Sequence, residues 1–127
     1  MDALRILIAD DESLRVMSLK GQLESIGHKV IAEASNGGEA VHLARELKPD
    51  LAILDIKMPE LDGIEAAKQI TAERPIPIIL LTAYSEKELA ERAAEANVAA
   101  YLMKPVSEQD LLPAIALAVS RFKESQA

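Results

Sequence analysis

Short apolar runs alternate with longer, helix-like stretches from one end of the chain to the other. The apolar runs cover residues 4–9, 30–34, 51–54, 78–81 and 99–103. Between and after these runs, apolar residues recur every three or four positions, which is the spacing of a helix with one buried face. The pattern therefore predicts five strands, each followed by a helix.

The starts and stops of the expected helices support this prediction. Four of the helical stretches open with a capping residue that has an acidic residue three positions later: Asn36, Asp62, Ser85 and Ser107. Such a pair satisfies backbone N–H groups that have no partner in the first turn of a helix. Gly27 is expected to end the first helix. Pro113 predicts a kink or a tighter first turn in the last one.

The alternation of strands and helices predicts the fold class. It indicates a single α/β domain over residues 1–127, with a parallel sheet between two layers of helices. The strongly apolar runs at 4–9, 51–54 and 78–81 suit central strands, whereas the run at 30–34 alternates more and suits an edge. A chain of 127 residues favours one core rather than two.

Composition narrows the class of protein. The chain contains no cysteine, which excludes disulfides, thiolate catalysis and zinc sites built on sulfur. It carries 14 basic against 21 acidic residues, a net charge of −7, and lacks the basic cluster that a nucleic-acid-binding surface needs. No apolar run approaches the ~20 residues of a membrane span, and the N-terminal stretch is typical of a strand rather than of a secretion signal. We therefore expect a cytoplasmic protein with no direct nucleic-acid binding and no membrane contact.

The two histidines, His28 and His42, stand alone in the sequence. Without a second ligand three or four positions away, a solvated or rim position is the better expectation for each of them. Neither histidine is therefore a candidate metal ligand.

Polar side chains stand where the expected strands end. Asp10 and Asp11 follow the first apolar run, Asp55 the third, Thr82 the fourth and Lys104 the fifth. Ligands of open parallel α/β sheets bind at the carboxyl ends of the strands, so we expect these side chains to meet in one pocket. Taken alone, the other side chains have an ordinary explanation as a helix cap, a strand end or a solvated loop residue, but Asp55 ends a central run with no helix start directly after it. Their coincidence at four strand ends favours a functional site.

Carboxylates that cluster in this way predict a metal-assisted reaction. They repel one another and are tolerated together mainly when a hard cation joins them. Mg²⁺ suits such a site because it binds a few carboxylate oxygens, keeps water ligands and accepts phosphoryl oxygens. A carboxylate beside the ion can act as a nucleophile and form an aspartyl phosphate. Lys104 and the hydroxyl of Thr82 are suited to offset the charge of the phosphoryl group.

The same residues carry a family resemblance over the whole chain. The matching pieces, in order, are Asp10-Asp11, Asp55, Met58-Pro59 with Asp62-Gly63, Thr82-Ala83 and Lys104-Pro105. With these motifs at these intervals, the chain resembles the receiver domain of two-component response regulators. The resemblance implies a doubly wound, flavodoxin-like (βα)₅ fold with strand order 2-1-3-4-5.

The resemblance implies a role for each residue of the pocket. Asp55 would be the phosphoacceptor, supplied by the phosphohistidine of a sensor histidine kinase. Asp11, Asp55 and the main-chain carbonyl of Lys57 would bind Mg²⁺ directly, and Asp10 would hold the water shell of the ion. Lys104 would contact the phosphoryl group. On this interpretation the protein is not an enzyme, although it assists its own phosphorylation and dephosphorylation.

A conformational switch is also implied by the resemblance. Thr82 would move toward the phosphoryl group and Tyr101 would rotate inward behind it, relaying the event to the fourth helix and fifth strand. Without the resemblance, Tyr101 is equally well interpreted as a half-buried strand aromatic. The Lys104–Pro105 peptide bond is expected to be cis. A homodimer through the fourth helix, fifth strand and fifth helix is a further expectation.

The resemblance also implies that two side chains flank the path of the hydrolytic water. Lys57 stands two residues past Asp55, and Tyr84 stands two residues past Thr82. Neither is a carboxylate or an amide able to orient that water, so we predict slow self-dephosphorylation, lasting minutes or longer. The alternative is that both side chains merely line the mouth of the pocket.

The output of the switch is left open between two alternatives. The segment 99–122, including Pro113, is similar to receivers of the antitermination-regulator type, whose output is a small helical RNA-binding domain that regulates transcription. The other alternative is a stand-alone receiver that acts by docking to a partner protein. A Mg²⁺-dependent aspartyl-phosphate phosphatase of the haloacid dehalogenase type would need a second acid where Lys57 stands. A flavin carrier would need a phosphate-binding loop where Asp10 and Asp11 stand.

Overall fold

The computed structural model describes residues 3–82 and 98–126 of the chain. Its elements, in chain order, are β1 (Arg5–Ala9), α1 (Ser13–Ser25), β2 (Lys29–Ala34), α2 (Gly37–Leu47), β3 (Leu51–Asp55), α3 (Gly63–Glu73), β4 (Ile78–Thr82), β5 (Ala100–Met103) and α5 (Glu108–Gln126). The five strands form one sheet in the order β2-β1-β3-β4-β5, and all four neighbouring pairs are parallel. The predicted strand order is confirmed, whereas the helix expected to begin at Ser85 lies outside the described residues.

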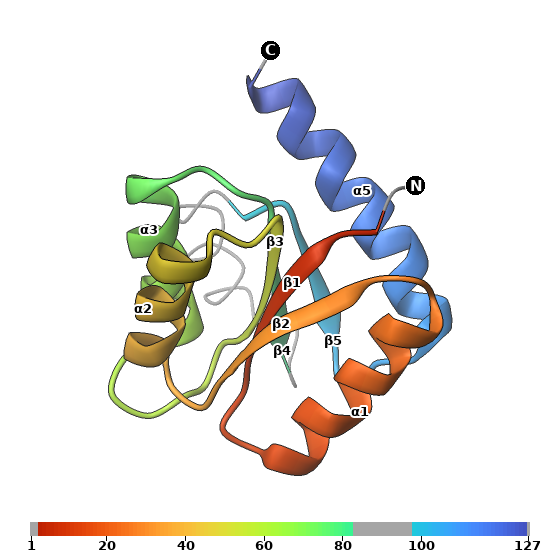
Figure 1. Ribbon diagram of the computed structural model, residues 1–127, viewed down its shortest axis with the longest axis horizontal. Helices are drawn as coiled ribbons and strands as arrows, with labels where there is room; N and C mark the ends of the chain where they lie inside the picture. Colours follow the sequence, from red (N-terminus) through yellow and green to blue (C-terminus); the bar gives the residue numbers. More distant parts are fainter. Residues whose placement is uncertain (1–2, 83–97, 127) are drawn as a thin grey trace.

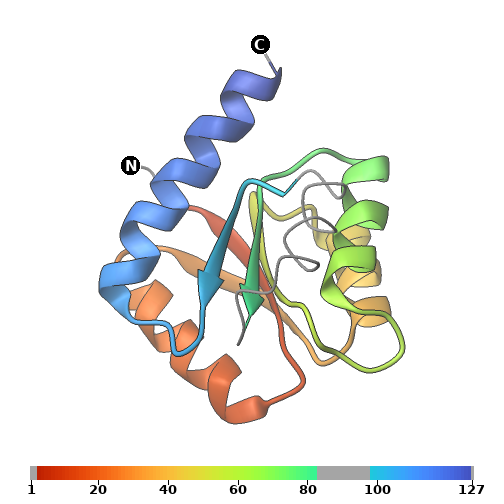
Figure 2. The same ribbon diagram turned by 180° about the vertical axis from the view of Figure 1, so that it is seen from behind.

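Helices cover both faces of the sheet. Figures 1 and 2 show α1 and α5 on one face and α2 and α3 on the other. Side chains alternate between the faces along each strand, so Ile6 and Ile8 of β1 pack toward α1 and α5. Leu7 and Ala9 pack in the opposite cluster with residues of α2 and α3. The sheet therefore separates two apolar cores and holds its strand ends between them.

Burial along the strands follows their place in the sheet. Every residue of β3 is buried, because this central strand has a neighbour on each side and helices on both faces. The edge strand β2 is mostly half-exposed, as its more alternating sequence predicts. The opposite edge strand, β5, exposes 48% of Tyr101 and 56% of Met103. Tyr101 is thus exposed in this structure, not turned into the pocket.

Three of the predicted helix starts lie in the described part of the chain, and all three are observed. Asn36 Oδ1 accepts a hydrogen bond from Glu39 N at 2.8 Å, and Asp62 Oδ1 accepts one from Glu65 N at 2.9 Å. At α5 the direction is reversed, since the N–H and hydroxyl of Ser107 both donate to Asp110 Oδ2 at 3.1 Å. Helix α5 contains Pro113 and continues on both sides of it. No helix in these described ranges is long and apolar enough to cross a membrane.

His28 corrects one prediction. It was expected at a solvated or rim position, but only 8% of the residue is exposed. Its Nδ1 atom accepts a hydrogen bond of 3.0 Å from the backbone N–H of Leu4, just before β1. Burial lowers the pKa of His28, because a charged imidazolium is poorly solvated there. The ring is a structural acceptor at the amino end of the sheet.

Candidate functional site

The carboxyl ends of β1 and β3 bring three carboxylates together. Asp55 is the last residue of β3 and is 3% exposed, while Asp10 directly follows β1 and is 1% exposed. Asp11 is exposed beside them. One oxygen from each of the three side chains lies within 4.8 Å of the other two. The predicted meeting of Asp10, Asp11 and Asp55 is therefore confirmed.

Lys104 reaches this cluster from the end of β5. Its Nζ atom lies 2.7 Å from Asp55 Oδ1, and 16% of its side chain is exposed. The backbone N–H of Lys104 donates a 2.8 Å hydrogen bond to the carbonyl oxygen of Thr82, which ties the ends of β4 and β5 together. The peptide bond between Lys104 and Pro105 is cis, as the resemblance implies. Thr82, Lys104 and Asp55 thus stand at three neighbouring strand ends.

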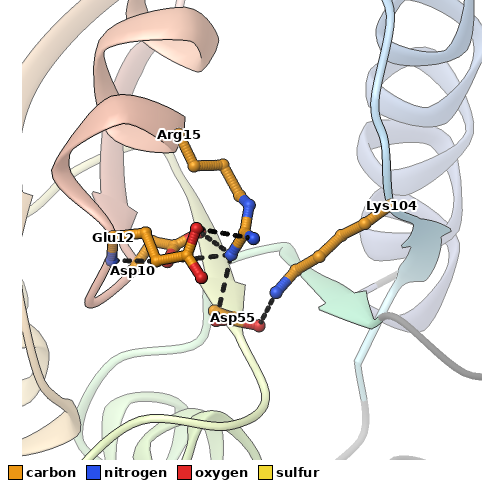
Figure 3. Close-up of polar contacts among 5 residues, drawn as sticks. All are labelled: Asp10, Glu12, Arg15, Asp55 and Lys104. Carbon is orange, nitrogen blue, oxygen red and sulfur yellow. Dashed lines mark hydrogen bonds and ion pairs between the residues drawn. The ribbon is translucent and has the colours of Figure 1, made fainter.

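Arg15, in the first turns of α1, is a member of the site that the sequence analysis missed. Its Nη1 atom donates to both carboxylate oxygens of Asp10, at 3.1 and 3.0 Å, and lies 3.6 Å from Asp55 Oδ2. Its Nη2 atom lies 3.0 Å from Glu12 Oε2. Figure 3 shows Arg15 and Lys104 approaching Asp55 from different sides. Each carboxylate oxygen of Asp55 therefore faces its own cation.

A sequence signal for Arg15 existed in retrospect. The residue comes three positions after Glu12, so the two face the same side at the start of a helix. Asp10 also stabilises the backbone just before α1, because its Oδ1 atom accepts a 3.0 Å hydrogen bond from the backbone N–H of Glu12. An arginine just after an acidic run is therefore placed to fold back onto that run.

Burial dominates the electrostatics of Asp55. Removal from water raises the pKa of Asp55, and the negative charge of Asp10 acts in the same direction. The hydrogen bond from Lys104 and the charges of Lys104 and Arg15 lower the pKa but do not cancel the effect of burial. For the cation Arg15, burial acts in the opposite direction and lowers the pKa. The hydrogen bond to Asp10 and the charges of the nearby carboxylates outweigh burial, so the pKa of Arg15 is raised.

The loop after β3 is folded closely against the backbone of Asp55. The N–H of Gly63 donates a 2.8 Å hydrogen bond to the carbonyl of Ile56. A Cβ atom at Gly63 would collide with the carbonyl oxygen of Asp55, and one at Gly37 would collide with that of Leu61. Both positions need glycine because the backbones approach too closely for a side chain. Asp62 then caps α3, so the Asp62-Gly63 pair both starts a helix and shapes the wall beside Asp55.

The remaining predicted residues have different outcomes. Lys57 lies in this loop with an exposed side chain, and its role as a main-chain metal ligand stays a prediction. Tyr101 lies on β5 with an exposed ring, and its inward rotation also stays a prediction. Tyr84, the second predicted lifetime residue, lies outside the described residues.

The donor set fits a hard divalent cation. It consists of carboxylate oxygens alone, two of them from nearly buried side chains. Buried like charges are costly unless cations balance them, and oxygen donors are the ligands that Mg²⁺ prefers. Asp10, Asp11 and Asp55 are therefore suited to hold Mg²⁺, either directly or through its water ligands.

Comparison with known sequences points to one family. The sequence profile of the response regulator receiver domain matches residues 6–116. The transcriptional regulatory protein PdtaR of Mycobacterium tuberculosis is 53% identical over 120 residues, which cover 94% of this chain and 58% of that protein. Protein PilH of Pseudomonas aeruginosa is 40% identical over 114 residues, which cover 87% of this chain and 93% of that protein. The chain thus spans little more than half the length of PdtaR.

Comparison with solved structures agrees. The signal receiver domain of a modulated diguanylate cyclase from Desulfovibrio desulfuricans matches with a TM-score of 0.89 and 38% identity, covering 98% of this chain and 99% of that chain. A CheX–CheY complex with beryllium fluoride and magnesium from Borrelia burgdorferi matches with a TM-score of 0.85 and 26% identity, covering 90% of this chain and 87% of that chain.

Proposed function

The chain belongs to the response regulator receiver domain family, and on that premise we propose that Asp55 accepts a phosphoryl group from the phosphohistidine of a sensor histidine kinase. The observation that carries this assignment is the position of Asp55. It is a nearly buried carboxylate at the end of the central strand, in the acidic cluster and in contact with Lys104. Among the three clustered carboxylates, Asp55 is the one that contacts Lys104.

The transfer follows from the chemistry of these groups. One carboxylate oxygen of Asp55 forms the new O–P bond as the N–P bond to the kinase histidine breaks, and the imidazole nitrogen leaves with the bonding electrons. Lys104, already 2.7 Å from Asp55, offsets charge on the phosphoryl oxygens, and the Thr82 hydroxyl donates to one of them.

Magnesium is the cofactor that we propose for this site. Asp11, Asp55 and the main-chain carbonyl of Lys57 would hold the ion, and Asp10 would hold its water ligands. When bound, Mg²⁺ supplies the positive charge that offsets the carboxylates and the incoming phosphoryl group. The CheY complex of Borrelia burgdorferi contains magnesium together with beryllium fluoride, which supports this proposal.

The switch that we propose runs from Thr82 to Tyr101. Thr82 ends β4 beside Met103 of β5, and Lys104 is hydrogen-bonded to its carbonyl. A movement of Thr82 toward the phosphoryl group therefore displaces the backbone of β5, and the exposed Tyr101 on this strand turns inward. Lys57 and Tyr84 leave the hydrolytic water without a carboxylate or amide to orient it, so the phosphorylated state decays over minutes or longer.

The partners of the switch are proposals as well. Four apolar side chains on β5 and α5 are exposed: Tyr101, Met103, Leu112 and Leu117. They support a docking or homodimer surface on β5 and α5, to which the helix expected to begin at Ser85 would also contribute. The similarity to PdtaR, a transcriptional regulatory protein, supports control of transcription, with antitermination through an RNA-binding output domain as the specific form. The alternative is a stand-alone receiver that docks to a partner. We place the protein in the cytoplasm, where sensor kinases present their phosphohistidine, and assign it no enzymatic activity on other substrates.

Phosphorylation by a small-molecule donor tests the assignment. Incubation with acetyl phosphate and Mg²⁺ should add one phosphoryl group to the wild-type chain and none to Asp55→Asn, as read by intact-protein mass spectrometry. Asp50→Asn is a matched control, because Asp50 lies at the opposite end of β3 and accepts a hydrogen bond from Arg5. Equal mass gain in wild type and Asp55→Asn, or no gain in any form, would contradict the proposal.

A further inference from the structure

Arg15 contacts the same acidic cluster in which the proposed function places Mg²⁺. Its Nη1 atom is 3.0 Å from Asp10 Oδ2 and 3.6 Å from Asp55 Oδ2. The clustered carboxylate oxygens lie within 4.8 Å of one another. A guanidinium nitrogen this close to two of three clustered carboxylates stands in the space that a cation shared by them would take.

The contacts of Arg15 are asymmetric in a way that matters. Toward the interior it holds two carboxylates that are nearly buried, Asp10 and Asp55. Toward solvent it holds Glu12, whose side chain is 63% exposed. The arginine side chain itself is 28% exposed, so its guanidinium can swing outward about the Glu12 contact without unpacking the core. Glu12 thus offers a partner that remains after the interior contacts are given up.

From this geometry we infer that Arg15 is an exchangeable counter-cation, which balances Asp10 and Asp55 until Mg²⁺ displaces it toward Glu12. The inference rests on the proposed metal site and deepens it, because it names the residue that sets the metal affinity. Mg²⁺ binding becomes an exchange of one cation for another, and the apparent affinity is weaker than the acidic cluster alone would give. Arg15 also leaves Asp55 Oδ2 when the ion binds, while Lys104 stays on Oδ1.

Electrostatics support the exchange over simple coexistence. Two cations within a few ångströms repel strongly when water is largely excluded, and nearly buried carboxylates leave little water to screen them. One guanidinium balances a single charge, whereas the cluster carries three carboxylates. A divalent ion is therefore the better match, and Arg15 is the weaker occupant that it replaces.

The binding of Mg²⁺ alone, measured by isothermal titration calorimetry on the unphosphorylated chain, tests the inference. Arg15→Gln removes the competing charge and should lower the dissociation constant by about tenfold, within the usual range of coupling between two ligands. Arg15→Lys keeps the charge but has one side-chain nitrogen to share among Asp10, Asp55 and Glu12. Its dissociation constant for Mg²⁺ should therefore fall between those of wild type and Arg15→Gln. Arg45→Gln is the matched control, because it makes the same change in net charge at the exposed pair with Glu73.

A second measurement follows the Arg15 side chain itself during Mg²⁺ binding. The guanidinium signal of Arg15 is assigned by its absence from the NMR spectrum of Arg15→Gln. In a titration with Mg²⁺, this signal should shift and saturate at the same concentration as the backbone amide signals of Asp11 and Asp55. The Arg45 signal should not move. A stationary Arg15 signal, or an affinity of Arg15→Gln no tighter than that of Arg45→Gln, would overturn the inference.

These outcomes are distinct from a failure of the proposed function. If wild type binds Mg²⁺ and is phosphorylated on Asp55 but Arg15→Gln binds no more tightly, only the role of Arg15 is refuted. If no variant binds Mg²⁺, both the metal site and the exchange are refuted.

Discussion

The two ends of β1 carry similar charged groups that are held in different ways. At the amino end, Arg5 donates from its guanidinium to the carbonyls of Lys48 and Leu47, each at 2.8 Å, and its backbone N–H donates to Asp50 at 2.9 Å. At the carboxyl end, Arg15 contacts the side chains of Asp10 and Asp55. Both ends therefore have an arginine and an aspartate within hydrogen-bonding reach.

The difference lies in the partners. The carbonyls that Arg5 contacts belong to Leu47 and Lys48 at the end of α2, where the last carbonyls of a helix have no partner within the helix. The carboxylates that Arg15 contacts belong to the cluster that we propose to hold Mg²⁺ and, at Asp55, to accept the phosphoryl group. An arginine that contacts backbone carbonyls, as Arg5 does, has a structural role. An arginine that contacts clustered carboxylates, as Arg15 does, shares groups that are suited to chemistry.

The largest expected effect comes from neutralising one aspartate at each end. Asp10→Asn should weaken Mg²⁺ binding and slow phosphorylation by acetyl phosphate by about 10- to 100-fold, because outer contacts of a metal site carry that much affinity. Asp50→Asn should change the same initial rate by less than about twofold, since it removes an equal charge at a screened distance. Equal effects of the two variants on the phosphorylation rate would erase the distinction between the ends.

A smaller effect is expected from the arginine at the amino end. Arg5→Gln loses two hydrogen bonds to the end of α2. Because both hydrogen bonds are exposed to water, their loss should lower the free energy of unfolding by only about 1 kcal/mol. The loss should be the same with and without Mg²⁺ in urea unfolding monitored by circular dichroism. A loss that depends on Mg²⁺ would show that the two ends are coupled.

The smallest effect concerns pH and the amino end alone. Burial lowers the pKa of His28, so the folded chain binds this proton less readily than the unfolded chain does. The stability contributed by the neutral ring is complete above the unfolded-state value of about 6.5 and is lost as the pH falls through it toward the lower folded-state pKa. We expect a loss of about 1 kcal/mol or less, the size of the hydrogen bond to Leu4.

Histidine variants isolate this contribution. His28→Gln should flatten the decrease in unfolding free energy between about pH 7.5 and about pH 5.5. His42→Gln replaces an exposed histidine and should leave the decrease unchanged. A decrease that persists in His28→Gln would assign the pH dependence to other groups.

Much of the fold could be predicted because its cues are local. The capping pairs at Asn36, Asp62 and Ser107 involve residues three positions apart, and the central place of β3 follows from its uninterrupted apolar run. His28 could not be placed in the same way. Its partner, the N–H of Leu4, is 24 residues away, and only the pairing of β1 with β2 brings the two together.

By itself, the sequence determined the alternation of strands and helices and the polar residues at the strand ends, because both depend on the order of side chains along the chain. The strand-end positions also predicted the grouping of Asp10, Asp11, Asp55, Thr82 and Lys104, and the family motifs added the strand order. Only the tertiary structure decided that Arg15 reaches the carboxylate of Asp55 as well as the acidic run beside it and that the backbone at Gly63 lies against Asp55. Those contacts depend on the reach of a side chain and the approach of two backbones, which the spacing of residues does not specify.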